Sequence, residues 1–249
     1  MIKADYDKRG ILFPIRIFST DDISFYRKEF DNVNGNIQLD KKNGKSTDRH
    51  FDLEFVWNLA TYPGLISFMQ ELIGPDLLLL ATDFFVKQGD PTSESFVAWH
   101  QDSTYWGLQP PEAHTAWIAL DDSTEENGSM RVIPGSHHNG LVMHGNSSRK
   151  GNLLSINQEI PDELVETEKA EHVNLKAGEI SVHDGRLFHS SMPNRSTNRR
   201  AGLTVRFITP NVKQTKNNSL GGFYKPILVA GRDRLQNFPK VDKPFPIQN

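Results

Sequence analysis

Hydrophobic residues recur every three or four positions over the first third of the chain, which is the spacing of one face of a helix. This spacing predicts helices over about 21–31, 53–59 and 63–73. An N-cap and an acidic first turn in Ser19-Thr20-Asp21-Asp22 begin the first helix, and Gly74-Pro75 ends the third. Residues 32–50 are polar and predict a loop. We therefore expect a mainly helical N-terminal part over about 1–75.

After residue 75 the pattern changes to short hydrophobic runs separated by turn residues, as is typical of β-strands. The predicted strands are 77–80, 84–86, 95–101, 114–120, 130–133, 179–183 and 203–208. Helices followed by many short strands predict an α+β chain. Its core, over about 76–210, is expected to be a two-sheet, cupin-like jelly roll with the N-terminal helices packed on one sheet. Residues 211–249 predict a loop-rich tail, and we expect 1–249 to form one domain.

Composition narrows the classes of partner and chemistry. The 249 residues carry a net charge of −3, which argues against nucleic acid as a main partner because phosphate binding needs a basic surface. The chain has no cysteine, which excludes disulfides, thiolate catalysis and Cys-based metal sites. It has no apolar run of about 20 residues for a membrane span and no signal-peptide core near Met1. These features predict a cytoplasmic enzyme and leave its oligomeric state open; a small-molecule substrate is expected only from the family resemblance given below.

A histidine and a carboxylate two residues apart end the predicted strand 95–101. Alternation along an extended segment places His100 and Asp102 on one side and Gln101 on the other. With a distant second histidine, His189, they form the residue set of a 2-His-1-carboxylate facial triad. Such a triad holds Fe(II) on one face and leaves the opposite face open. The alternative is a core histidine that is hydrogen bonded to a nearby carboxylate.

Other histidines compete for this role. The pair His50 and Asp52 has the same spacing, but it follows the polar, turn-rich stretch 41–49, which predicts an exposed loop. His183 could replace His189 as the third ligand, although it opens a turn at Asp184-Gly185. Spacing alone leaves these alternatives open.

An arginine beyond His189 could complete a cosubstrate site. A turn at Pro193-Asn194 would send 200–208 back as a strand beside His189. The planar fork of an arginine at the start of that strand suits a carboxylate. The three candidates are Arg195, Arg199 and Arg200, and a solvated basic turn is the alternative for each of them.

Taken in order, these segments resemble the phytanoyl-CoA dioxygenase family from about Gly10 to Pro210. The motifs that carry the resemblance are Trp99-His100-Gln101-Asp102, Thr115-Ala116-Trp117-Ile118-Ala119-Leu120, the segment from Glu126 to His137, the segment from His183 to His189, and Arg200. The resemblance implies a double-stranded β-helix (jelly-roll) fold and a dioxygenase that uses Fe(II), 2-oxoglutarate and O₂. It implies that His100, Asp102 and His189 are the iron ligands and that Arg200 binds the distal carboxylate of 2-oxoglutarate. Ser191, Trp117 and Phe84 match positions that line the same pocket.

The resemblance also implies a class of reaction. Halogenating relatives have Ala or Gly in place of the carboxylate, so Asp102 implies hydroxylation, or another oxidation of an unactivated C–H bond, with release of succinate and CO₂. Tyr105, Trp106 and Leu108, just after the ligand strand, are candidate substrate contacts, with core packing as the alternative. A non-redox metal-dependent isomerase or epimerase and a non-catalytic ligand-binding barrel remain alternative functions. The sequence does not identify the substrate.

Overall fold

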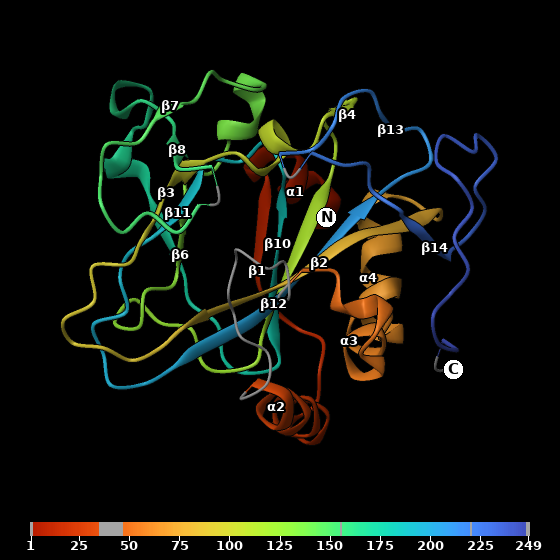
Figure 1. Cartoon of the computed structure of the whole chain (residues 1–249), viewed down its shortest axis with the longest axis horizontal. Helices are drawn as coiled ribbons and strands as arrows, with labels where there is room; N and C mark the ends of the chain where they lie inside the picture. The colour runs from red at the N-terminus through yellow and green to blue at the C-terminus, as the bar shows by residue number, and fades with distance from the viewer. Residues whose placement is uncertain (1, 35–46, 155, 220, 248–249) are drawn as a thin grey trace.

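Two antiparallel sheets form the centre of the protein. The computed structural model describes residues 2–34, 47–154, 156–219 and 221–247. The larger sheet runs in the order β1 (Ile11–Arg16), β10 (Glu179–Asp184), β5 (His114–Ala119), β12 (Arg200–Ile208), β2 (Leu77–Lys87) and β14 (Ile227–Ala230) (Figure 1). The smaller sheet runs in the order β3 (Val97–His100), β11 (His189–Ser191), β6 (Met130–Val132) and β9 (Glu171–Val173). Two short pairs join β4 (Leu108–Gln109) to β13 (Lys213–Gln214) and β7 (Gly145–Asn146) to β8 (Gln158–Glu159).

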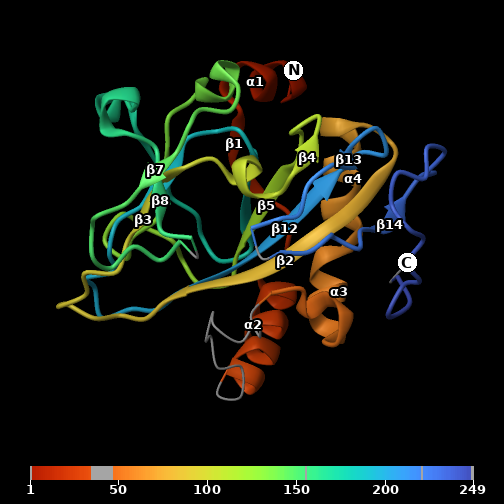
Figure 2. The same ribbon diagram turned by 45° about the horizontal axis from the view of Figure 1, so that its top comes forward.

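The N-terminal helices pack on the larger sheet (Figures 1 and 2). They are α1 (Ile2–Arg9), α2 (Thr20–Asn34), α3 (Glu54–Ala60) and α4 (Pro63–Ile73). One hydrophobic core joins Phe30, Trp57 and Met69 of the helices to Leu203 and Val205 of β12. The three predicted helices are thus confirmed, as is their packing on one sheet. Short 3-10 turns lie at Arg49–Phe51, Asp102–Tyr105, Ser136–Asn139, Asp162–Leu164 and Thr167–Lys169.

The larger sheet extends beyond the predicted core of 76–210 at both ends. Strand β1 pairs with β10, and β14, within the predicted loop-rich tail, pairs with β2. The two predicted strands 77–80 and 84–86 are one strand, because the polar residues between them find partners inside the protein: Thr82 faces His50, and Asp83 pairs with Arg206. Of the predicted loop, 35–46 lie outside the described residues.

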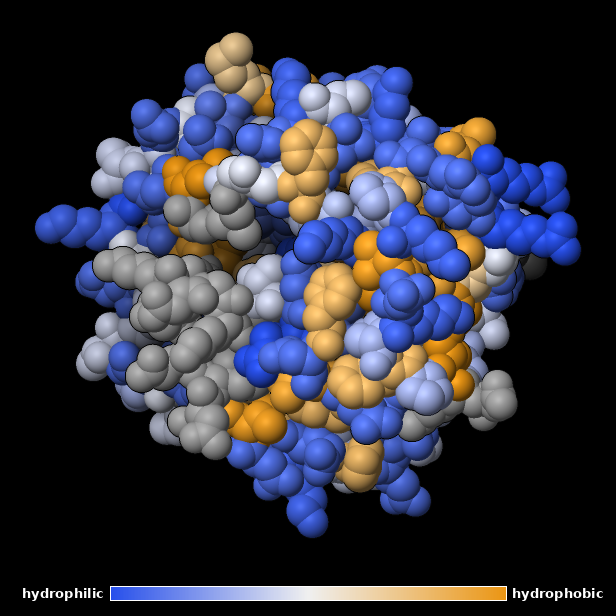
Figure 3. All heavy atoms as spheres, turned by 45° about the vertical axis from the view of Figure 1, so that its right-hand side comes forward, coloured by the Kyte–Doolittle hydropathy of each residue, from blue (hydrophilic) through white to orange (hydrophobic). Residues whose placement is uncertain are grey.

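The face that carries β14 and the C-terminal segment shows hydrophobic side chains in patches separated by hydrophilic ones (Figure 3). Among the described residues, no helix is both long enough and apolar enough to cross a membrane. Buried hydrophobic clusters fill the space between the helices and the larger sheet and the space between the two sheets.

Candidate metal and cosubstrate site

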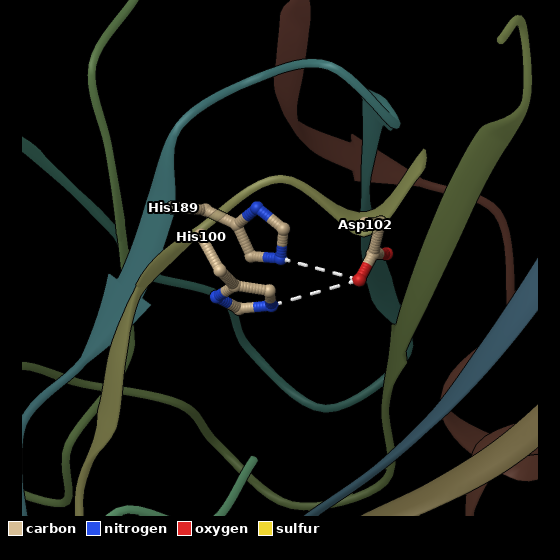
Figure 4. Close-up of side chains that lie close together, drawn as sticks. All are labelled: His100, Asp102 and His189. Carbon is tan, nitrogen blue, oxygen red and sulfur yellow. Dashed lines mark ion pairs between the residues drawn. The ribbon is translucent and has the colours of Figure 1, made fainter. Parts of the chain in front are cut away.

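The predicted ligand residues converge where the smaller sheet meets the turn after β3 (Figure 4). His100 ends β3 and His189 begins β11, and the two residues are direct cross-strand partners with ring centroids 4.0 Å apart. Asp102 follows at the start of a 3-10 turn. Its Oδ1 lies 3.6 Å from Nε2 of His100 and 3.8 Å from Nε2 of His189. One possible ligand atom from each of the three residues lies within 4.8 Å of the others, as a shared metal ion requires.

Backbone carbonyls fix which nitrogen of each imidazole faces the carboxylate. Nδ1 of His100 lies 2.9 Å from the Ala98 oxygen, and Nδ1 of His189 lies 3.0 Å from the Leu187 oxygen. A carbonyl only accepts, so each Nδ1 carries a hydrogen, and in the neutral form of each ring the lone pair is on Nε2. Burial is the main reason that the pKa of His189 lies well below its ordinary value, so this imidazole stays neutral. Both rings are therefore suited to bind a cation through Nε2.

The Asp102 carboxylate is charged despite its surroundings. Burial acts to raise the pKa of Asp102, but the neighbouring imidazoles of His100, His183 and His189 and the Arg206 guanidinium outweigh it, and the pKa falls well below its ordinary value. An ionised carboxylate beside two imidazoles is a donor set that suits Fe(II).

Gln101, between two of these residues, holds the end of the strand in place. Its amide nitrogen donates to the carbonyl oxygens of Gly140 (2.7 Å) and Arg186 (2.6 Å), and its side-chain oxygen accepts from the Val142 N–H (2.9 Å). The side chain is fully buried and points away from the ligand side. Sequence analysis placed Gln101 on the opposite face but missed this positioning role.

The two competing histidines, His183 and His50, are not part of the group of possible metal ligands. His183 lies beside the other carboxylate oxygen, with its Nε2 3.7 Å from Asp102 Oδ2, and it is not part of the metal-ligand group found among the described residues. The prediction of an exposed loop is wrong at His50, because this residue is fully buried. Its Nδ1 lies 3.0 Å from Thr82 Oγ1. Its short turn packs on β2. Asp52 instead pairs with Arg49.

Arg200, the first residue of β12, carries a buried charge beside the same cavity. Its Nη1 donates to the Gly128 carbonyl oxygen (2.6 Å), and its guanidinium lies 5.4 Å from the centre of the Trp117 ring. Within the described ranges Arg200 forms no ion pair, and its buried Nε has no hydrogen-bond partner. Burial lowers its pKa to about 10. A buried cation with an unused donor needs an anionic partner, and a carboxylate fits that need.

The cavity beside Arg200 also contains the ligand residues. It has a volume of about 60 Å³, several times the roughly 10–15 Å³ needed by one water molecule. Its lining includes His100, Asp102, Trp117, His189, Ser191 and Arg200. The predicted metal ligands and three of the four predicted cosubstrate residues therefore share one cavity.

Lys87 is a second buried cation near this cavity, and sequence analysis missed it. It is the direct cross-strand partner of Arg200, and its Nζ donates to Ser191 Oγ (2.7 Å) and to the Met192 carbonyl oxygen. The only signal in the sequence was a lysine at the end of an otherwise apolar run. Its charge adds to the positive character of this end of the cavity.

Comparison with known proteins places this geometry in a family. A family model described as phytanoyl-CoA dioxygenase (PhyH) matches residues 6–202. The chain belongs to the PhyH family. A probable alpha-ketoglutarate-dependent hypophosphite dioxygenase of Stutzerimonas stutzeri is 26% identical over 215 residues, which span 84% of this chain and 73% of that protein. The L-proline trans-4-hydroxylase of Streptomyces griseoviridis is 29% identical over 167 residues, which span 60% of this chain and 61% of the hydroxylase, less than two-thirds of its length.

A solved structure shares the fold of this chain. The non-heme monooxygenase ThoJ, in its apo form, is 26% identical and superposes with a TM-score of 0.80, covering 98% of this chain and 88% of ThoJ. The shared mixed helical and antiparallel sheet architecture thus extends over nearly the whole chain.

Phe84, expected from the PhyH resemblance to line the cosubstrate pocket, does not lie there. Its ring packs among the helices, with its centroid 4.9 Å from that of Phe30 and 6.3 Å from that of Phe55. The neighbouring Phe85 lines the cavity instead. Successive side chains of β2 point to opposite faces of the sheet, so the predicted position is wrong by one residue.

This correction predicts opposite effects for two neighbouring substitutions. Phe84→Ala is expected to lower the free energy of unfolding by about 3–5 kcal/mol, because it opens a cavity in the core, and to leave the Kd of 2-oxoglutarate unchanged. Phe85→Ala is expected to cost less stability and to alter that Kd. Denaturant unfolding and ligand titration measure the two quantities. A weaker 2-oxoglutarate complex in Phe84→Ala alone would contradict this placement.

Of the three predicted substrate contacts, two are core residues. Trp106 and Leu108 are buried in a cluster with Ile208, so for them core packing is the correct alternative. Tyr105 differs, because its ring centroid lies 6.3 Å from that of His100 and its buried hydroxyl has no partner among the described residues. Tyr105 therefore stays a candidate for contact with a substrate beside the metal.

Proposed function

We propose that this protein hydroxylates an unactivated C–H bond of a small-molecule metabolite and releases succinate and CO₂. Family membership identifies it as an Fe(II)- and 2-oxoglutarate-dependent dioxygenase. The observation that carries the proposal is the position of Arg200, a buried cation without a counter-ion among the described residues, in the cavity that also holds His100, Asp102 and His189.

Six of the residues that line the cavity have a role in this proposal. His100 and His189 bind Fe(II) through Nε2, and Asp102 binds it through Oδ1. Arg200 holds the distal carboxylate of 2-oxoglutarate, with the Ser191 hydroxyl and the Trp117 ring beside it. Fe(II), 2-oxoglutarate and O₂ together supply the oxidising power. The chain orients them and excludes most water, since His100 and His189 are buried and the Asp102 side chain is 13% exposed.

Asp102 favours hydroxylation over halogenation, because it occupies the coordination position that a halide would need. We also infer that the two sheets form a double-stranded β-helix and that residues 1–249 act as one domain. The alternative of a non-redox isomerase or a simple ligand-binding barrel gives no role to a buried, uncompensated Arg200.

The substrate is proposed to be small. The two relatives compared above are named for hypophosphite and for L-proline, both small polar molecules. The Tyr105 hydroxyl is placed to donate a hydrogen bond to such a molecule close to His100.

Anaerobic titration of the apoprotein with Fe(II) and 2-oxoglutarate tests the proposal. A weak visible charge-transfer band is expected when both are present and not with either alone, because the band needs the keto acid bound to iron. On admission of O₂, one succinate should form per hydroxylated product. A chlorinated product would contradict the role of Asp102, and absence of the band would contradict the cosubstrate site.

A further inference from the structure

The two oxygens of the Asp102 carboxylate face different surroundings. Oδ1 faces the two imidazoles His100 and His189. Oδ2 faces three other groups: Thr115 Oγ1 at 3.4 Å, His183 Nε2 at 3.7 Å and Arg206 Nε at 4.0 Å. We propose that Thr115, His183 and Arg206 are positioning residues that hold Oδ2 away from the metal, so that Asp102 offers it Oδ1 alone. The proposal rests on the proposed metal site.

The sheet register shows why these three residues meet one oxygen. Strands β10, β5 and β12 are neighbours in the larger sheet. His183 is the direct partner of Thr115, and Thr115 is the direct partner of Arg206. The three side chains thus form a straight row across the sheet, which we call the donor row. His100 and His189 are likewise direct partners, but in the smaller sheet. Asp102 lies between the histidine pair and the donor row.

The buried donor row lowers the stability of the fold when it is considered without a metal site. Neither ring nitrogen of His183 has a hydrogen-bond partner among the described residues, and the same holds for Nε of Arg206, although all three atoms are buried. A buried polar group without a partner destabilises a protein by about 1–3 kcal/mol. Apolar side chains would fill this space at lower cost. The position of these donors around one carboxylate oxygen indicates a role at the metal site.

Arg206 is held in place from its other side. Its Nη1 donates to Asp83 Oδ2 (3.1 Å), and its guanidinium lies 5.3 Å from the centre of the Trp106 ring. Asp83 in turn accepts a hydrogen bond from Thr47 Oγ1 (2.8 Å). Arg206 therefore approaches Asp102 from a fixed direction, and its charge keeps Oδ2 on the side of the donor row.

Single-oxygen binding matters for the chemistry. A ligand set of two imidazoles and one carboxylate oxygen occupies one face of a six-coordinate metal and leaves three positions for a chelating keto acid and O₂. A carboxylate that bound through both oxygens would remove one of these positions. The donor row thus favours the coordination that the proposed oxygenase needs.

Metal titration of apoprotein variants tests the donor row without turnover. His183→Phe and Thr115→Val keep the size of the side chain and remove the donor. Each is expected to weaken Mn(II) binding by about 10–100-fold, as is usual for residues that orient a metal ligand. The apoprotein Tm of His183→Phe should stay the same or rise, because a buried imidazole without a hydrogen-bond partner is lost. His183→Gln, which restores a donor, should bind Mn(II) more tightly than His183→Phe.

Ser181→Ala is the matched control. Ser181 lies two residues before His183 on β10, is buried, and also has a hydroxyl without a partner among the described residues, but it is paired with Trp117 and not with Thr115. Its Mn(II) affinity should equal that of the wild type. In the Fe(II) and 2-oxoglutarate complex, His183→Phe should also shift the charge-transfer band, which Ser181→Ala should not.

These titrations distinguish a failure of the proposed metal site from a failure of the donor row. If wild-type protein and His189→Ala bind Mn(II) equally weakly, the proposed metal site is wrong and the donor row has no role. If the wild type binds Mn(II) and the His183 and Thr115 variants bind it equally well, the metal site stands and the donor row is overturned. A fall in Tm that parallels the loss of affinity would also overturn it, because it would indicate a purely structural role.

Discussion

His189→Ala is expected to leave the protein without bound Fe(II) and to reduce succinate formation by at least about 1,000-fold. His189 supplies one of the three ligand atoms that lie within 4.8 Å of one another. Losing a ligand costs metal binding several kcal/mol, and each ~1.4 kcal/mol corresponds to a factor of ten. Metal analysis after anaerobic reconstitution and a succinate assay measure the two effects. The fold should persist, because His189 hydrogen bonds only to the nearby Leu187 carbonyl among the described residues.

His50→Gln provides the control for this experiment. His50 belongs to the second His-x-Asp pair, is buried, and contacts Thr82 on the helix-facing side of the sheet. We expect it to lower stability and to keep one iron per chain. If His189→Ala kept its iron, His183 would be the third ligand, and the assignment of His189 would be wrong.

Local pattern predicted two residues of the metal-ligand group, His100 and Asp102. The alternation of His100, Gln101 and Asp102 at the end of a hydrophobic run predicted one shared side and one opposite side, and the structure has both. The distant histidine followed from the family resemblance, and the register of β3 against β11 places it directly opposite His100. The helices were also predictable, because their hydrophobic spacing is regular and Ser19 and Asp22 form a reciprocal cap.

Which face a strand residue occupies was less predictable where strand boundaries were uncertain. Phe84 was chosen for the cavity from the family resemblance, and the predicted break within β2 left no continuous alternation against which to check that choice. The break was expected because Thr82 and Asp83 are polar, and their partners His50 and Arg206 are distant in the sequence. Contacts between residues far apart in the sequence give no signal in the local spacing of hydrophobic residues.

Burial by distant segments explains the other differences. Trp106 and Leu108 were predicted to contact the substrate because they follow the strand that ends in His100. They pack against the end of β12, and β4 pairs with β13 from the predicted tail. The strand β14 in that tail was missed because its four residues lie within a region rich in turn residues.

Arg200→Ala is expected to weaken 2-oxoglutarate binding by about 100-fold or more. The residue is buried, lines the metal cavity, and has one donor, Nε, without a partner among the described residues. Removing one member of a buried charge pair typically costs about 2–5 kcal/mol, and 2.7 kcal/mol is ~100-fold in Kd. Arg200→Lys should recover only part of this loss, because an ammonium lacks the planar fork that matches a carboxylate. Titration of the anaerobic Fe(II) complex, followed through the charge-transfer band, gives each Kd.

Arg199→Ala is the matched control, because neighbouring residues of a strand point to opposite faces. Arg199 donates to Asp121 and Asp31 at the helix side of the sheet, whereas Arg200 faces the cavity. Its loss should lower stability without changing the Kd of 2-oxoglutarate at saturating Fe(II). Equal Kd values for Arg200→Ala and the wild type would remove Arg200 from the cosubstrate site. Equal weakening in both variants would indicate a general effect of positive charge instead of a specific guanidinium–carboxylate contact. Of these two arginines, only Arg200 is expected to have a large effect, because its buried guanidinium lines the cavity that holds the three candidate iron ligands.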